Sequence, residues 1–135
     1  MSVQSDVTAV TITADTLAAD DDGISANAAV GNNAALTIGG ALADGGSVTL
    51  SNARKVTITS AGDDDGISFT IVGTDINGTA QTESLTGADS GVATSAAFFL
   101  TIASITAVGD PAGNVKAGIS ADSSSIVFSG RARLK

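Results

Sequence analysis

The stretch from Arg54 to Gly87 constrains the fold most, because it combines a regular alternation of apolar and polar residues with clear turn signals. Apolar residues alternate with threonine or serine in two runs, at Val56 and Ile58 and then at Ile67, Phe69 and Ile71. A period of two places one face of a strand in a core and the other face in water. The stretch therefore predicts β-strands.

Turn signals separate these runs. Asn77-Gly78 favours a two-residue hairpin turn, because both residue types tolerate positive φ. The strand after it, at about residues 79–85, carries Gln81 and Glu83, which is typical of an edge strand. We predict a three-stranded antiparallel meander over Arg54 to Gly87, with an acidic turn before its second strand.

Further strands are predicted on both sides of the meander, at 7–14, 35–38, 47–50, 115–119 and 126–128, together with a short helical turn at 16–19. Turn signals recur about every 8–12 residues, as in sandwich folds. The predicted fold is all-β: an immunoglobulin-like antiparallel β-sandwich with short strands and little or no helix.

The most apolar run covers residues 96–108. Its inward phase is predicted to be Phe98, Leu100 and Ile102, followed by a shift to Ile105. A shift of one residue within a strand is what a β-bulge produces, so we predict a bulge near Ala103-Ser104. In the alternative, Phe98 and Phe99 flank a bend and the strand begins later.

Residues 35–135 are predicted to form the sandwich domain, and residues 1–34 an N-terminal arm and first strand packed on it. The sequence V-T-I-T occurs at 10–13 and 56–59, and D-D-D-G-I-S at 20–25 and 63–68. These matches indicate either a decayed duplication of a unit of about 45 residues or chance similarity in a sequence of low complexity. Under both interpretations we expect the two acidic segments to form turns of similar shape.

The composition excludes several kinds of active site. The chain has no Cys and no His, so a Ser-His-Asp triad and a thiolate metal site are ruled out. We expect a protein that is not an enzyme and binds no cofactor. Aromatic residues make up only 3% of the chain, which predicts a thin core of the kind that a partner surface often supplements.

Charge and hydropathy limit the partners. The chain has six basic and fourteen acidic residues, which gives a net charge of −8. Nucleic-acid binding, in contrast, needs a cationic surface. No run approaches the roughly 20 apolar residues of a membrane span, and the N-terminus lacks a basic region followed by an apolar one. We expect a soluble protein that binds neither nucleic acid nor membrane.

The two D-D-D-G segments are the candidate metal sites. Carboxylates beside a turn glycine suit Ca²⁺. However, consecutive side chains of an extended segment point to opposite sides, and the alternating spacing of a calcium-binding EF-hand is absent. The alternative, two solvated turns, is favoured, so we predict no metal site.

Candidate partner-binding residues lie in two places. The C-terminal S-G-R-A-R-L-K would present Arg131, Arg133 and Lys135 on one face of a strand, either for docking to an acidic partner or as an ordinary solvated terminus. Phe98 and Phe99 point to opposite faces of one strand. One ring can enter the core, and the other needs cover, which predicts a homo-oligomeric contact, for example in a trimer.

The order of R-K-V-T-I-T-S-A-G-D-D-D-G-I-S-F-T-I-V-G-T-D-I-N-G, then F-F-L-T-I-A-S-I-T-A, then S-G-R-A-R-L-K resembles a pattern common in small structural proteins of tailed bacteriophages, many of them from marine bacteria. The resemblance covers roughly residues 35–135. It implies an immunoglobulin-like virion component without an active site.

Within that class, the expected function is capsid decoration, that is, a cement protein that binds the outer capsid surface and stabilises the head. Its partners would be the major capsid protein or other virion proteins, and further copies of itself. It would be made in the host cytoplasm and lie on the outer surface of the virion. The alternative is a tail, neck or fibre component. A carbohydrate- or host-surface-binding module is disfavoured, because the chain has no Trp or Tyr for a sugar ring to stack on.

Overall fold

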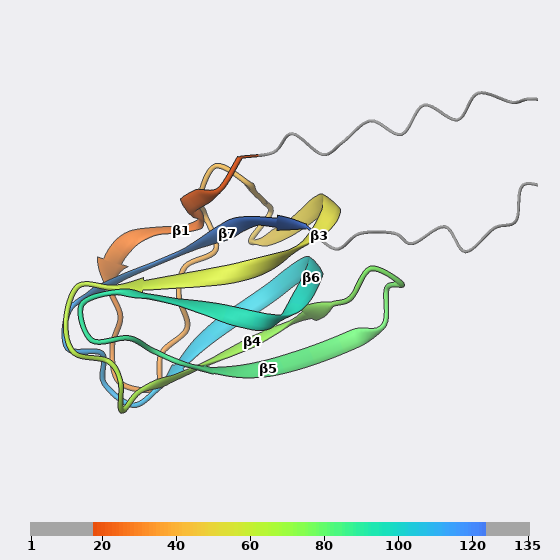
Figure 1. Cartoon of the computed structure of the whole chain (residues 1–135). Coiled ribbons are helices and arrows are strands. Elements are labelled where there is room, and N and C mark those ends of the chain that lie inside the picture. The colour runs from red at the N-terminus through yellow and green to blue at the C-terminus, as the bar shows by residue number, and fades with distance from the viewer. Residues whose placement is uncertain (1–17, 124–135) are drawn as a thin grey trace, which may run out of the picture.

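The computed structural model describes residues 18–123. Within this range the regular secondary structure consists of β-strands, without a helix (Figure 1). The strands are β1 (Asp20–Ala29), β2 (Ala43–Asp44), β3 (Ser47–Ser60), β4 (Ser68–Thr74), β5 (Ala80–Thr86), β6 (Val92–Val108) and β7 (Asn114–Ser123). The predicted all-β class is confirmed. The described range accordingly contains no helix long and apolar enough to cross a membrane.

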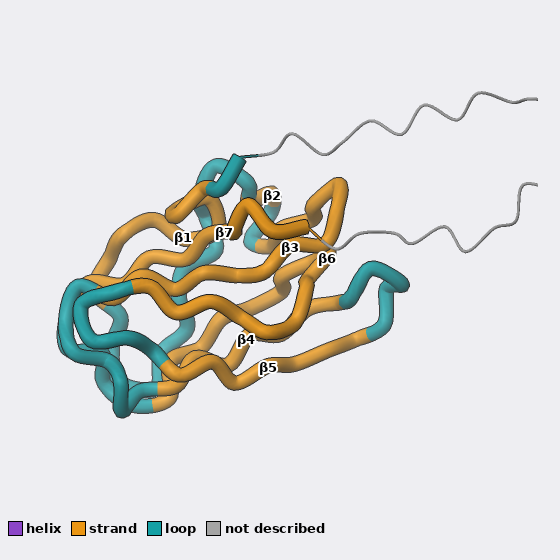
Figure 2. The backbone as a smooth tube through the Cα atoms, viewed as in Figure 1, coloured by secondary structure: helices purple, strands orange, loops and turns teal. Residues whose placement is uncertain are grey.

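The strands form one antiparallel sheet that folds over into a sandwich. Its order is β1-β7-β3-β6-β4-β5, and β2 pairs with β3 outside this path. Strand β6 links the two layers, because residues 92–102 pair with β3 whereas residues 101–108 pair with β4. Figures 1 and 2 show β6 bending sharply between these parts, so that β1, β7 and β3 lie in one layer and β4 and β5 in the other.

The core lies between the two layers and follows the predicted alternation in three strands. The inward positions of β3, β4 and β7 are buried as expected, namely Val56, Ile58, Phe69, Ile71, Val115, Ala117 and Ile119. Burying a side chain of the size of Val, Ile or Phe stabilises a fold by about 1.5–3 kcal/mol. These three strands therefore hold the layers together.

The predicted meander is only partly correct. Strands β4 and β5 form the expected hairpin, with unbroken pairing from Ser68 with Thr86 to Thr74 with Ala80, and β5 is an edge strand as predicted. Strand β3, however, does not pair with β4, because β6 lies between them in the sheet. The connection at 61–67 crosses between the layers instead of forming a hairpin.

The turn between β4 and β5 also differs from the prediction. It spans residues 75–79, and the amide of Asp75 donates to the carbonyl of Thr79 at 2.9 Å. The amide of Gly78 donates to the carbonyl of Asp75 at 3.0 Å, and Gly78 has a φ of +78°, whereas the φ of Asn77 is not positive. This is a longer hairpin loop that ends in a left-handed glycine, and the predicted two-residue turn was wrong.

Two strands are longer than the short strands that were predicted. Strand β3 has 14 residues and β6 has 17. The predicted bulge near Ala103-Ser104 is confirmed, because Val72 pairs with Ser104 but Gly73 pairs with Ile102, which leaves Ala103 as the extra residue. Gly73 is required there, since a Cβ atom would lie 1.9 Å from the carbonyl oxygen of Thr101.

The inward phase predicted for β6 was wrong at its start. The ring of Phe99 is completely buried, whereas Phe98 and Leu100 are only half-buried. The cause is a second irregularity, where five steps of β3 from Thr49 to Arg54 face two steps of β6 from Thr101 to Phe99. The inward phase of β6 therefore changes between Phe99 and Ile102, so that Phe99 and not Phe98 faces the core. A third irregularity lies at the start of β6, where two steps of β3 from Lys55 to Thr57 face four steps of β6 from Phe98 to Thr94; it adds an even number of residues and leaves the phase unchanged.

The N-terminal part of the described chain is built into the same sandwich. Strand β1, which lies in the segment 1–34, pairs with β7, and its Ile24 is buried in the same core. The predicted strand at 35–38 is absent; Ala35 forms an isolated bridge with Thr106, and Leu36 is buried. The elements predicted at 7–14 and 126–128, and most of the turn at 16–19, lie outside the described residues.

Candidate functional site

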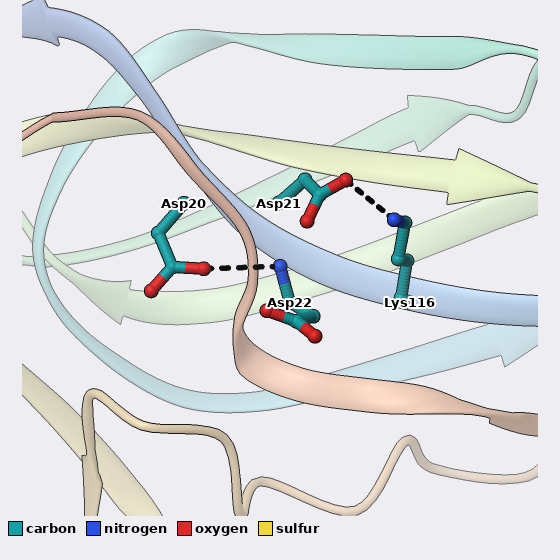
Figure 3. A network of polar contacts seen from close by, with 4 residues as sticks. All are labelled: Asp20, Asp21, Asp22 and Lys116. Atoms are coloured by element: carbon teal, nitrogen blue, oxygen red, sulfur yellow. Dashed lines mark hydrogen bonds and ion pairs between the residues drawn. The ribbon is translucent and has the colours of Figure 1, made fainter.

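The three aspartates of the first D-D-D-G segment lie together at the start of β1 (Figure 3). One carboxylate oxygen from each of Asp20, Asp21 and Asp22 lies within 4.8 Å of the others. The segment was predicted to be a turn, but it belongs to a strand, whereas the second segment, 63–66, is a turn between β3 and β4. The predicted similarity of shape was therefore wrong.

An irregular register brings these carboxylates together. Asp20 pairs with Ile119 and Ser25 with Ala117, so five steps of β1 face two steps of β7. The segment follows β7 closely, and a Cβ atom on Gly118 would lie 1.9 Å from the carbonyl oxygen of Asp20. Because the extra residues interrupt the regular alternation, consecutive aspartates do not have to point to opposite sides.

Lys116 of β7 lies beside this cluster and neutralises part of its charge. Its ammonium group forms an ion pair with the carboxylate of Asp21, while the amide of Asp22 donates to Asp20 Oδ1 at 3.3 Å (Figure 3). The hydrogen bond to Asp21 raises the pKa of Lys116, and the charges of Asp21 and Asp22 raise it further, against the effect of burial. A cation bound to the three carboxylates would compete with this ammonium group, and the prediction of no metal site stays a prediction.

An open surface pocket adjoins the acidic cluster. Asp20 and Asp21 line it together with Thr57 and Thr59 of β3. The hydroxyl oxygens of both threonines are buried and have no hydrogen-bond partner. Since these oxygens do not reach the surface of the pocket, they add no ligand atoms to the carboxylates.

The structure separates the two rings that were predicted to make partner contacts. Phe99 is fully buried, so it is this ring, and not Phe98 as the predicted phase had it, that enters the core. Phe98 is half-buried, and the ammonium group of Lys55 lies over its ring at 5.4 Å from the ring centre. Part of the cover that Phe98 needs therefore comes from its own chain. Arg131, Arg133 and Lys135 lie outside the described residues.

Asp64 joins two loops. It was predicted to lie in a solvated turn, but it is buried. Asp64 is completely buried, and its Oδ1 accepts a hydrogen bond from the amide of Ala112 at 2.7 Å. Its own amide donates to the carbonyl of Ala88 at 3.1 Å. Nothing in a run of three aspartates marks the middle one, so this role could not be found from the sequence.

A second group that was missed holds the irregular start of β6. Ser95 Oγ accepts from the buried amide of Val56 at 2.9 Å and donates to the carbonyl of Ala97 at 2.8 Å. From β5, the carboxylate of Glu83 accepts from the amides of Ala96 and Ala97 at 2.7 and 2.8 Å. These contacts satisfy backbone groups that the bulge removes from the ladder.

Comparisons with models of protein families, with curated proteins and with solved structures found no match to this chain.

Proposed function

We propose that this chain is a structural protein of a bacteriophage virion, and specifically a decoration protein that binds the outer surface of the capsid. The proposal rests on the resemblance of residues 35–135 to small virion proteins and on the placement of the charges. The placement of the charges is the structural argument, because it indicates which cations are available to bind a partner.

The three cations within residues 18–123 are all engaged inside the molecule. Arg54 is buried, and its Nη1 donates to the carbonyls of Ser120 and Ala121 at 3.3 and 3.0 Å. Lys116 is paired with Asp21, and Lys55 lies over the ring of Phe98. The other three cations of the chain are Arg131, Arg133 and Lys135.

This distribution supports docking through the C-terminal segment. Twelve acidic residues and three basic residues lie within 18–123, so the sandwich is strongly acidic. The clustered C-terminal cations can pair with carboxylates on a capsid surface, and arginine can do so through two parallel hydrogen bonds. In this proposal the sandwich is a rigid cap, and the C-terminal segment attaches it to the capsid.

The proposal predicts that the C-terminal arginines control retention on particles. Replacing Arg131 and Arg133 by Ala should leave the melting temperature of the isolated protein nearly unchanged, but should lower the amount that co-sediments with particles lacking the natural protein. Retention of the wild type should itself fall as ionic strength rises, because salt screens exposed ion pairs, whereas retention of the alanine variant should depend less on salt.

A matched variant separates charge from geometry. Replacing the same two arginines by Lys keeps both charges but removes the paired hydrogen bonds, so its retention should lie between wild type and the alanine variant. Full retention of the alanine variant at raised ionic strength would refute docking through this segment.

A further inference from the structure

One face of the sandwich carries no charge. It is the outward face of β4, β5 and residues 101–108 of β6. Because these strands pair residue by residue, their outward side chains form rows across the three strands. We call it the threonine face; it consists of Ser68, Thr70, Val72, Thr74, Ala80, Thr82, Ser84, Thr86, Thr101, Ser104, Thr106 and Val108. Thr74 and Thr101 share a hydrogen bond of 2.7 Å between their hydroxyl groups, which confirms that these positions lie side by side.

The absence of charge on this face contrasts with the rest of the chain. The only ionisable residue in these three strand segments is Glu83, whose carboxylate is engaged with the amides of Ala96 and Ala97 in the first part of β6. Charged side chains make up 15% of the whole chain, which corresponds to about two in every twelve residues. The twelve residues of the threonine face carry none, so this face is depleted of charge relative to the rest of the chain.

The threonine face also exposes apolar groups that suit a contact. Val72 and Val108 are 37% and 50% exposed, and they are two of the four large apolar residues that are exposed within the described chain. A third, Ile76, lies in the turn that joins β4 to β5. Valine and threonine are branched at Cβ and stiff, so ordering them in a contact costs little side-chain entropy.

We infer that the threonine face is a self-association surface, and that its partner is the same face of a second copy. Two copies with a net charge of −8 repel each other wherever their acidic surfaces meet. On the threonine face they can approach without facing like charges, and a twofold axis makes any such patch complementary to itself. This inference goes beyond the proposed function and does not depend on it.

The size of the face sets the strength of the contact. Three strands about 4.8 Å apart and seven residues long, at about 3.3 Å per residue, give a patch of roughly 14 by 23 Å. Stable dimers usually bury about 800 Å² per partner, which is more than this patch offers. The association is therefore weak and depends on concentration.

Ionic strength provides a distinctive signature. Salt screens the repulsion between two acidic copies but does not weaken a contact that contains no ion pairs. Self-association through the threonine face should therefore strengthen as salt rises. A contact between the C-terminal cations and acidic groups of another copy would weaken.

The test is sedimentation equilibrium of the full chain over a range of concentrations at low and moderate ionic strength. Thr82→Glu places a charge at an exposed position of the threonine face, and Thr94→Glu places the same charge on an exposed threonine of β6 that pairs with β3 instead. Thr82→Glu should weaken self-association at least tenfold, because it sets like charges opposite each other. Thr94→Glu should stay close to wild type.

Circular dichroism checks that each variant is folded, and Ser84→Glu, also exposed on β5, replaces Thr82→Glu if that variant does not fold. The inference is overturned if the wild type stays monomeric at every concentration and salt level, if its association weakens with salt, or if the variants on the face associate as well as Thr94→Glu does. Because the isolated protein is measured, failure of binding to particles would not change this outcome.

Discussion

At the scale of single residues, Asp64 shows how one side chain fixes the relation between two loops. Its buried carboxylate accepts the amide of Ala112, and the amide of Ala61 donates to the carbonyl of Asn114 at 2.9 Å nearby. The loops approach so closely that a Cβ atom on Gly62 would lie 2.8 Å from the carbonyl carbon of Ala112. The loop at 61–67 is thereby held against the loop at 109–113.

Replacing Asp64 by Ala should reduce the free energy of unfolding by about 1–3 kcal/mol, because the amide of Ala112 would lose its acceptor. Asp64→Asn keeps a carbonyl oxygen and should lose less. The matched control is Asp65→Ala at an exposed neighbour, which should change stability by about 0.5 kcal/mol or less. Urea unfolding measures all three. Equal effects of Asp64→Ala and Asp65→Ala would contradict the assigned role.

At the scale of elements, the irregular start of β6 depends on the side chain of one serine. Ser95 supplies the acceptor that the amide of Val56 lacks at this point of the ladder. Replacing Ser95 by Ala should lower the free energy of unfolding by about 1–3 kcal/mol, since a buried donor is left without a partner. The amide of Val56 should also exchange its hydrogen faster. Thr94→Ala, at the exposed position before it, is the control, and comparable losses in both variants would argue against this account.

The same elements show how far sequence analysis reached. Alternation is a local property, so it correctly predicted the buried faces of β3, β4 and β7. Pairing depends on residues far apart in the chain, and no local pattern indicated that β6 would separate β3 from β4. In β6 itself, the confirmed bulge at Ala103 was visible as a shift of phase. The phase of β6 also changes between Phe99 and Ile102, where the extra residues lie on the partner strand, between Thr49 and Arg54 of β3. The sequence of β6 gives no signal of them, so the prediction for Phe98 failed.

The candidate sites were harder to predict than the strands. The sequence marked the first acidic cluster, but it did not show that Lys116, far along the chain, would lie beside it. The roles of Asp64, Ser95 and Glu83 are contacts with backbone amides of distant segments, which leave no motif. The threonine face appears only when the register of β4 with β5 and β6 is known.

At the scale of the whole molecule, two strand–loop–strand units, β3 with β4 and β6 with β7, pair reciprocally. The pattern I-T-x-x-G-D-x-x-G occurs at 58–66 and again at 105–113, each time covering the end of one strand and the loop before the next. The first unit consists of β3 and β4, and the second of β6 and β7. The second strand of each unit pairs with the first strand of the other, because β7 pairs with β3 and β4 pairs with β6. Ile58 pairs with Ala117, and Ile105 occupies the matching place opposite Ile71. A duplication would produce such an arrangement, but between other segments than the matches of 10–13 with 56–59 and of 20–25 with 63–68, for which duplication and chance similarity both stay open.

The central claim, a decoration protein on a virion, is tested most directly by its copy number per particle. Quantitative mass spectrometry of purified virions gives the ratio of this chain to the major capsid protein. Decoration predicts hundreds of copies, in a fixed ratio set by the capsid lattice. A count matching a single small ring would instead place the chain in the tail or neck, where parts follow closed cyclic symmetry. That count, or the absence of the chain from the particle, would contradict the account.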